Sequence, residues 1–146
     1  ITVVTGYRNF TLNDPPWDFR LQKRRVLTFV LDGKIKLPPA ENEVLPVVDD
    51  PKFQIDEKKA AFGEKTFTNH CFVCHGYGAV AGGAAPDLRK SEIPFSLEAM
   101  TEIIRDGGLM SGGMPQYEEF TDAQLEGIQH FIRRQARKSM ATQQTQ

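Results

Sequence analysis

The sequence predicts a mainly α-helical domain that follows a short β segment, and three features of its 146 residues predict this arrangement. Apolar residues alternate in residues 1–37, residues 38–55 are rich in proline and acidic residues, and apolar residues recur at helical spacing in residues 56–140. Residues 141–146 form a predicted polar tail. With 40% hydrophobic and 25% charged residues, the chain has the composition of a globular protein with one core.

The β segment contains two strand-like runs, Ile1–Thr5 and Val26–Leu31, with a predicted loop over Asn13–Trp17 between them. Asp32-Gly33 predicts a tight turn that leads into a third short strand at Lys34–Leu37. Because both faces of the Val26–Leu31 run are apolar, we expect this strand to be covered on both sides. Three strands alone cannot supply that cover.

The first predicted helix begins at Asp56, a residue type that caps helix N-termini, and runs to about His70. Five positions on it and just beyond it fall within a stripe of roughly 80° at the helical period. They are Ala60, Gly63, Phe67, Cys71 and Cys74. A glycine inside a helix costs roughly 1 kcal/mol relative to alanine. We therefore expect Gly63 to allow another helix to approach closely.

Two further helices follow. The middle helix, Leu97–Asp106, ends at Gly107-Gly108, and the last one begins at a capping box, Thr121–Gln124. The apolar face of the last helix consists of Leu125, Ile128, Phe131 and Ile132. Its final turns carry four basic residues, Arg133, Arg134, Arg137 and Lys138, whose charge suits the helix dipole at a C-terminus.

The run Cys71-Phe72-Val73-Cys74-His75 has the C-x-x-C-H spacing of a c-type haem attachment site. On a helical turn, residues three apart lie on one face, so both sulfurs can reach the vinyl carbons along one haem edge. The next residue, His75, then directs its imidazole toward the iron. The sequence therefore predicts one covalently bound haem c with His75 as an iron ligand.

Other interpretations of the two cysteines need different surroundings. A thioredoxin-like C-x-x-C needs a βαβ setting and makes no demand on a following histidine. A structural zinc site needs four ligands, and the chain has only two cysteines and three histidines in all. A simple disulfide leaves His75 without a role.

Composition excludes some classes of partner. The net charge is −1 and the sequence pI about 6.3, so no broad basic face predicts binding to nucleic acid or to an anionic membrane. No stretch approaches the roughly 18 consecutive apolar residues of a membrane span.

The frame G-x-x-x-F-x-x-x-C-x-x-C-H, a later Met-Pro and a terminal amphipathic helix resemble a class I cytochrome c over residues 56–138. The resemblance implies three main helices around one haem. It implies that Gly63 and Phe67 meet the last helix near Ile128 and Phe131. It also implies that the Pro86 carbonyl accepts a hydrogen bond from the His75 Nδ1–H.

Four methionines are candidates for the sixth iron ligand. Met100 lies on the apolar stripe of the middle helix, where a core position is expected, and Met140 is expected in a polar, frayed tail. Met110 and Met114 both lie in a glycine-rich loop. A thioether opposite histidine raises the reduction potential of an electron-transfer cytochrome. The family's loop pattern favours Met114, which Pro115 follows, over Met110.

Several other polar residues are expected to have no direct role at the iron. His70 is expected at the surface or near the propionates. His130 is expected on the last helix, beside its apolar face, and partly exposed. Ligation by two histidines remains the alternative. Tyr77, Tyr117 and Arg89 are possible hydrogen-bond donors to the haem propionates, and each is equally well explained as a loop residue.

The first half, with the run R-R-V-L-T-F-V-L-D-G-K-I-K-L-P-P followed by the linker, resembles the junction in quinohaemoprotein alcohol dehydrogenases over residues 1–50. This resemblance implies that an upstream β-propeller binds pyrroloquinoline quinone (PQQ) and calcium and oxidises an alcohol or a sugar hydroxyl. The haem domain would accept its electrons one at a time. An external acceptor, a small cytochrome, a cupredoxin or a quinone oxidase, would receive them.

The chain starts with a strand at Ile1 and lacks an initiator methionine and a signal sequence, so we expect it to be a fragment of an exported, periplasmic polypeptide. No residue in it resembles a quinone or calcium site, so the chain itself is predicted to be an electron-transfer relay. One alternative is a free, diffusible periplasmic cytochrome c with an unrelated β extension. Another is a haem enzyme that acts on oxygen or peroxide, which needs an open sixth position on the iron.

Overall fold

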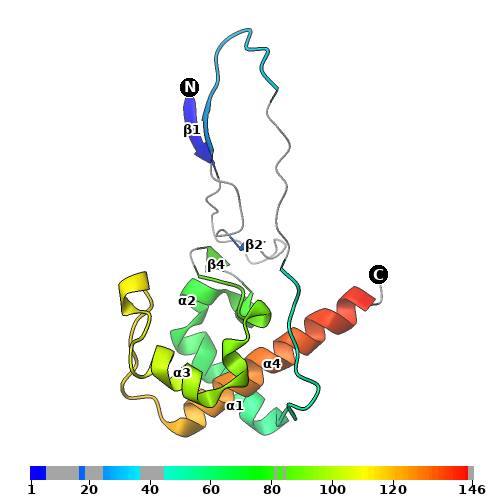
Figure 1. Cartoon of the computed structure of the whole chain (residues 1–146), viewed down its shortest axis with the longest axis vertical. Helices are drawn as coiled ribbons and strands as arrows, with labels where there is room; N and C mark the ends of the chain where they lie inside the picture. Colours follow the sequence, from blue (N-terminus) through cyan, green and yellow to red (C-terminus); the bar gives the residue numbers. More distant parts are fainter. Residues whose placement is uncertain (6–16, 19–24, 37–44, 81, 84, 145–146) are drawn as a thin grey trace.

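The computed structural model describes residues 1–5, 17–18, 25–36, 45–80, 82–83 and 85–144. The fold is mainly α-helical, as predicted, with the helices gathered into one body and a strand pair extending away from it (Figure 1). The α-helices are α1 (Glu57–His70), α2 (Phe72–His75), α3 (Leu97–Ile104) and α4 (Asp122–Gln144). Short 3-10 turns connect them: η1 (Tyr77–Ala79), η2 (Leu88–Lys90), η3 (Ile93–Phe95) and η4 (Met110–Gly112).

Helix α1 begins and ends at the residues that the sequence indicates. The Asp56 carboxylate accepts hydrogen bonds from the backbone N–H groups of Lys58 and Lys59, at 2.8 and 3.0 Å, which satisfies two of the unpaired donors of the first turn. At the other end the Cys71 N–H donates to the Phe67 carbonyl at 2.8 Å. The predicted cap and the predicted range are thus confirmed.

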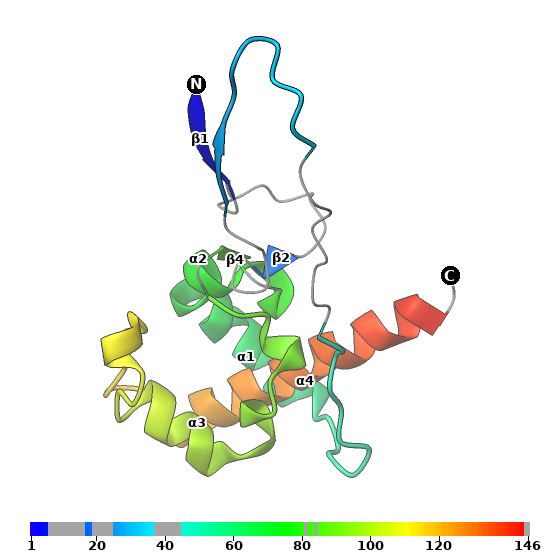
Figure 2. The same cartoon turned by 45° about the horizontal axis from the view of Figure 1, so that its top comes forward.

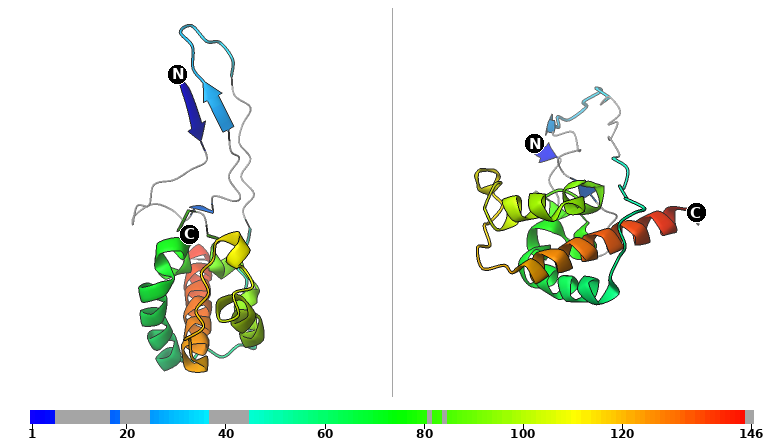
Figure 3. Two further views of the ribbon diagram at one scale, coloured as in Figure 1. Left: turned by 90° about the vertical axis from the view of Figure 1, so that its left-hand side faces the viewer. Right: turned by 60° about the horizontal axis from the view of Figure 1, so that its bottom comes forward.

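Helices α1 and α4 cross at a pair of glycines. A Cβ atom placed on Gly63 would lie 1.8 Å from the Gly127 carbonyl oxygen, so the two backbones are in direct contact there. One turn further along, the rings of Phe67 and Phe131 pack with centroids 5.0 Å apart. Figure 3 shows α4 running between α1 on one side and α3 on the other. The close approach expected of Gly63 is confirmed.

The core lies along this crossing and reaches α3. Its buried apolar members include Phe67, Ala79, Met100, Ile104, Phe120, Leu125, Ile128, Phe131 and Ile132. Met100 is 2% exposed, so its predicted role in the core is confirmed. The predicted apolar face of α4 is confirmed as well, because all four of its members are buried there.

Helix α4 starts with the predicted capping box, in which the Gln124 N–H donates to the Thr121 Oγ1 and the Thr121 N–H donates to the Gln124 Oε1. It then continues to Gln144, beyond the predicted start of the tail at residue 141. The arginines at 133, 134 and 137 therefore lie inside the helix and not in its final turns. Arg133 and Arg137 contact the linker, as described below, and Arg134 forms ion pairs with Glu57 and Glu64 of α1.

The β segment forms an antiparallel pair of β1 (Thr2–Thr5) and β3 (Arg25–Thr28), and both strands are shorter than predicted. A turn follows at Asp32, where the Gly33 N–H donates to the Val30 carbonyl at 3.2 Å. Residues 34–36 form no strand, so the third predicted strand is wrong over these residues, and residue 37 lies outside the described part.

Many of the apolar residues of β3 and the chain on either side of it face solvent. Ile1, Val26, Phe29, Val30, Leu31 and Ile35 are all exposed, with Leu31 at 97%. Figure 2 shows the pair standing clear of the helices. The described residues of this chain therefore do not supply the cover that the sequence leads us to expect for the Val26–Leu31 run.

A second, parallel strand pair was not expected. Strand β2 (Trp17–Asp18) lies beside β4 (Gly82–Gly83), so Trp17, predicted to end a loop, lies in a strand. The rest of that predicted loop lies outside the described residues. The pairing brings an upstream segment next to the chain that follows the cysteine motif.

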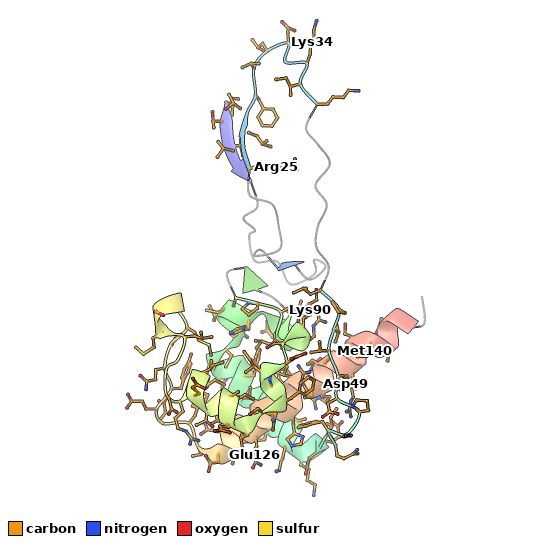
Figure 4. The ribbon with its side chains drawn as sticks, in the orientation of Figure 1. Arg25, Lys34, Asp49, Lys90, Glu126 and Met140 are labelled. Atoms are coloured by element: carbon orange, nitrogen blue, oxygen red, sulfur yellow. The ribbon has the colours of Figure 1, made fainter. Side chains whose placement is uncertain are left out.

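Residues 45–55, the described part of the linker, lie along α4 and η2. The Val48 N–H donates to the Arg89 carbonyl at 3.1 Å, and the Arg137 Nε lies 3.0 Å from the Asp49 Oδ2. Arg137 Nη2 also donates to the carbonyls of Asp50 and Phe53. Figure 4 shows Asp49 on this segment near α4. The linker thus lies over a surface, as predicted, and side chains of α4 hold it there.

His130 on α4 makes the stability of the domain sensitive to acid. The Asp56 N–H donates to the His130 Nδ1 at 3.0 Å, and burial, with Lys59 nearby, lowers the pKa of His130, against the opposite effect of Asp56 and Glu126. The folded state therefore binds its proton less readily than the unfolded state, whose histidine has a pKa near 6.5.

We expect the melting temperature to fall as the pH is lowered from 7 to 5, because protonation of His130 removes its acceptor nitrogen. His130→Gln should flatten this dependence. Asp56 also has a lowered pKa, but its carboxylate titrates below this pH range. A melting temperature of the unaltered protein that is constant between pH 7 and 5 would contradict the assignment.

Candidate haem site

The cysteine motif lies where α1 passes into α2. Cys71 ends α1, and its carbonyl accepts hydrogen bonds from the N–H groups of Cys74 and His75, at 3.2 and 2.9 Å. The motif is therefore one continuous helical turn, as the spacing requires for two sulfurs on one face. Cys71 and Cys74 are not joined by a disulfide in this structure.

The Cys71 thiol does not have the properties of the nucleophile of a redox-active dithiol. Burial, with a smaller contribution from Cys74, raises the pKa of Cys71 to about 12. Reactive C-x-x-C pairs depend on the opposite effect, because the thiolate is the nucleophile and its pKa must be lowered. The surroundings of Cys71 therefore favour the haem interpretation over the thioredoxin-like one.

The imidazole of His75 is buried and held by a backbone carbonyl. Its Nδ1 lies 3.2 Å from the Pro86 oxygen. A carbonyl oxygen can only accept, so Nδ1 carries the proton, and Nε2 is the nitrogen with a lone pair for a metal. Such a hydrogen bond orients an iron-bound imidazole and makes its Nε2 a stronger electron-pair donor to the metal. This is the arrangement that the resemblance to cytochrome c implies.

The segment after Pro86 contains a buried ion pair between Asp87 and Arg89. The Arg89 Nε and Nη2 donate to the two oxygens of Asp87, at 2.9 and 2.7 Å, and the Arg89 N–H donates to the same carboxylate. Both side chains are almost fully buried. Arg89, one of the possible hydrogen-bond donors to the haem propionates, is thus paired with Asp87.

Two aromatic residues considered as propionate partners lie at the edge of the motif. The Tyr117 hydroxyl donates to the His70 carbonyl at 2.9 Å, and Tyr77 is exposed. His70 is also exposed, and its ring packs edge-on against Tyr117 and Phe120. Tyr117 therefore joins the loop before α4 to the end of α1.

The histidines are not gathered at one centre. His130 is partly buried and bonds to Asp56 at the start of α1, whereas the cysteines lie at its end. A helix of 14 residues separates these ends by about 20 Å. Among the described residues, no group of three or more His, Cys, Asp and Glu side chains is placed to hold a metal ion.

The two loop methionines differ in burial. Met114 is partly buried and packs against the core, whereas Met110 is 57% exposed in η4. The loop is shaped by two left-handed glycines, Gly107 and Gly113, and by a hydrogen bond from the Met114 N–H to the Leu109 carbonyl. Met140 lies within α4 and not in a tail.

Sequence reasoning missed the role of Arg133, whose side chain is fully buried at 0% exposure. Its guanidinium donates to the carbonyls of Val48, Leu88 and Ser91, at 3.0, 3.1 and 3.2 Å, and lies over the Phe95 ring. Burial lowers the pKa of Arg133 to about 10, so it stays charged at neutral pH. Its position directly after two buried apolar residues of α4 was a signal for this burial.

The donors present fit a covalently bound haem. Two thiols and an imidazole lie on one turn, and the imidazole has the tautomer that iron needs. A set of partly buried side chains, largely apolar, packs against the core that also contains Phe67 of α1. These are Phe72, Leu88, Leu97, Ile103, Met114 and Tyr117. Fold and site together define a c-type cytochrome.

Comparison with known proteins agrees. Residues 58–132 match the family described as cytochrome C oxidase, cbb3-type, subunit III, and the chain belongs to this cytochrome c family. A domain of this family carries haem c and acts as an electron-transfer module. No helix in the described residues has the length and apolar character needed to cross a bilayer.

Longer curated proteins contain related segments. The chain is 37% identical over 118 residues to the dehydrogenase subunit of the alcohol dehydrogenase (quinone) of Gluconobacter oxydans, which covers 79% of this chain. It is 36% identical over 113 residues to the quinohemoprotein alcohol dehydrogenase ADH IIB of Pseudomonas putida, covering 75% of the chain. It is 35% identical over 126 residues to lupanine 17-hydroxylase [cytochrome c] of a Pseudomonas species, covering 83%.

These alignments span only 15%, 16% and 17% of the three relatives. They reach well beyond the family match at residues 58–132, because 126 aligned residues cannot fit within it. The relationship to quinohaemoprotein dehydrogenases therefore includes part of the chain outside the cytochrome domain.

Proposed function

We propose that Cys71 and Cys74 would hold one haem through thioether bonds and that His75 and Met114 would ligate its iron. Each thiol would add across one vinyl group, so that its proton and its sulfur both end on the former double bond. The bound haem supplies a one-electron couple. Cys71 and Cys74 prevent its loss, and Pro86 orients His75.

The observation that carries this proposal is the joint geometry of the motif. Three donors lie on one helical turn, and the 3.2 Å contact between His75 Nδ1 and the Pro86 oxygen leaves Nε2 as the ligand atom. Partial burial of Met114, against the exposure of Met110, supports Met114 as the sixth ligand. A thioether opposite an imidazole suits a carrier that works at a raised potential.

We further propose that the chain is the electron outlet of a PQQ-dependent alcohol dehydrogenase. Two of its relatives are named as an alcohol dehydrogenase (quinone) and a quinohemoprotein alcohol dehydrogenase, and these names suggest a quinone cofactor and an alcohol substrate. PQQ and calcium belong to a propeller domain upstream in the same polypeptide or complex. The complex lies in the periplasm, and a small cytochrome, a cupredoxin or a quinone oxidase takes the electrons.

The exposed strand pair supports this larger assembly. Apolar side chains of β3 and the following turn, such as Val26 and Leu31, stand in solvent in this chain. An exposed apolar edge of this kind is a liability that proteins normally cover. A propeller that includes β1 and β3 would supply the missing cover, whereas a free carrier would leave it unexplained.

Alcohol-driven reduction of the haem tests the proposal. In the natural polypeptide that contains this chain, supplied with PQQ and calcium, a primary alcohol should reduce the haem, seen as the sharp visible band of the ferrous form. A sugar and a secondary alcohol serve as further substrates, and a mixture without PQQ is the control. A haem that every alcohol and sugar leaves oxidised would favour the free cytochrome instead.

A further inference from the structure

We propose that Arg133 is a positioning residue for the haem ligand His75, acting through the backbone of the segment that carries Pro86. This inference rests on the haem attachment proposed above. It assigns to α4 and the linker a share in setting the reduction potential of the haem.

The first support is the cost of burying Arg133. A guanidinium taken out of water loses several kcal/mol of hydration that only well-placed partners offset. Here the partners are three neutral backbone carbonyls and the face of the Phe95 ring, 4.4 Å from the guanidinium carbon. An apolar side chain would fill the same space at lower cost, so the charge and the planar fork have a purpose at this position.

The second support is the identity of the carbonyls. Those of Leu88 and Ser91 bracket η2, which starts two residues after Pro86. The third belongs to Val48 of the linker, whose own N–H donates to Arg89 in the middle of η2. One guanidinium therefore ties α4, the linker and η2 together.

The third support is the stiffness of the path from η2 to the imidazole. Asp87 is 2% exposed and caps η2, and the Arg89 guanidinium donates a hydrogen bond to each of its two carboxylate oxygens. The chain between Leu88 and the Pro86 carbonyl thus has little freedom to adjust on its own. A displacement of η2 moves the Pro86 oxygen relative to the His75 Nδ1.

Replacement of Arg133 by Lys distinguishes the effect of the guanidinium hydrogen bonds from the effect of the positive charge. Lysine keeps the positive charge but places all its donors on one nitrogen, so it cannot hold the carbonyls that two separate guanidinium nitrogens hold, that of Val48 on Nη1 and those of Leu88 and Ser91 on Nη2. The Nδ1–H bond to Pro86 then weakens, the imidazole donates less to the iron, and the ferric state is less favoured.

In the haem-loaded full chain, we expect Arg133→Lys to raise the ratio of reduced to oxidised haem about threefold at a fixed potential. This equals an upward shift of about 30 mV, since tenfold is 59 mV for one electron. The Nδ1 proton of His75, followed by NMR, should also exchange faster with solvent. Loss of stability alone can speed the exchange, because buried protons exchange when the structure opens, but it would not shift the ratio of reduced to oxidised haem.

Arg137→Lys is the matched control. Arg137 lies one turn further along α4 and holds the same linker through Asp49, Asp50 and Phe53, and its described bonds do not include η2. This variant should lower the melting temperature but leave the potential unchanged. An unchanged ratio in Arg133→Lys, or an equal shift in Arg137→Lys, would overturn the inference.

If Arg133→Lys does not fold, Phe95→Leu takes its place. It leaves the guanidinium and its carbonyl partners but removes the ring on which the guanidinium lies. We expect the same direction of shift at smaller size, and no shift would count against Arg133. A parent protein without covalent haem would instead overturn the proposed function, so the two failures are distinguishable.

Discussion

Replacement of Gly63 by Ala is expected to lower the free energy of unfolding by about 3 kcal/mol, the upper part of the range for overpacked cores. The new Cβ would lie 1.8 Å from the Gly127 oxygen and 2.6 Å from the Ile128 nitrogen. These are backbone atoms of a helix and cannot rotate away, so α1 and α4 must separate. The gain in helix propensity, roughly 1 kcal/mol, offsets only part of this cost.

Urea unfolding of the haem-loaded protein measures this effect. Gly112→Ala is the control, because a Cβ at Gly112 meets nothing within 4 Å and its backbone is not left-handed. We expect the control to change stability by less than about 0.5 kcal/mol. Equal stability of Gly63→Ala and the parent protein would show that the helices do not cross in contact at these glycines.

Replacement of Met114 by Ala is expected to lower the reduction potential by about 0.1 V or more, within the roughly 0.8 V that axial ligands span. Loss of the thioether removes the ligand that favours ferrous iron. It also opens the sixth position, so carbon monoxide should bind to the reduced variant. Potentiometry and the carbon monoxide difference spectrum measure the two changes.

Met110→Ala is the matched variant from the same loop. Because Met110 is exposed and Met114 is partly buried against the core, we expect Met110→Ala to keep the parent potential and to resist carbon monoxide. The opposite pattern would make Met110 the ligand. Carbon monoxide binding by the parent protein itself would favour the alternative of an oxygen- or peroxide-active haem enzyme.

Features set by local sequence were predicted well. Asp56 and the capping box at Thr121 define helix starts through bonds to residues two or three positions away. Gly63 stood out because a glycine inside a helix costs stability and needs a reason. The C-x-x-C-H spacing is likewise local, since one helical turn fixes where both sulfurs lie.

Features set by distant contacts were not predicted. The burial of Arg133 depends on Val48 and Ser91, which lie 85 and 42 residues away in the sequence. The pairing of β2 with β4 joins Trp17 to Gly82, and nothing in either short run indicates its partner. The contact of Pro86 with His75 came from family resemblance, because a backbone carbonyl leaves no mark in a sequence.

The length of α4 shows a different limit. Polar residues from 141 onward suggested a tail, yet the helix continues to Gln144. Gln and Ala are good helix formers, so propensity carries the helix past its last buried residue. The charge pattern of the arginines was then interpreted as a helix end, although their partners are on the linker and on α1.

The mass of the unfolded polypeptide tests the central claim most directly. The natural protein is denatured in acid, extracted with organic solvent to remove any haem that is not covalently bound, and its fragment containing the motif is weighed. We predict that this fragment carries the mass of one haem, that Cys71→Ser and Cys74→Ser each retain it by a single bond, and that the double variant releases it. A parent fragment with the mass of the bare peptide would contradict the account.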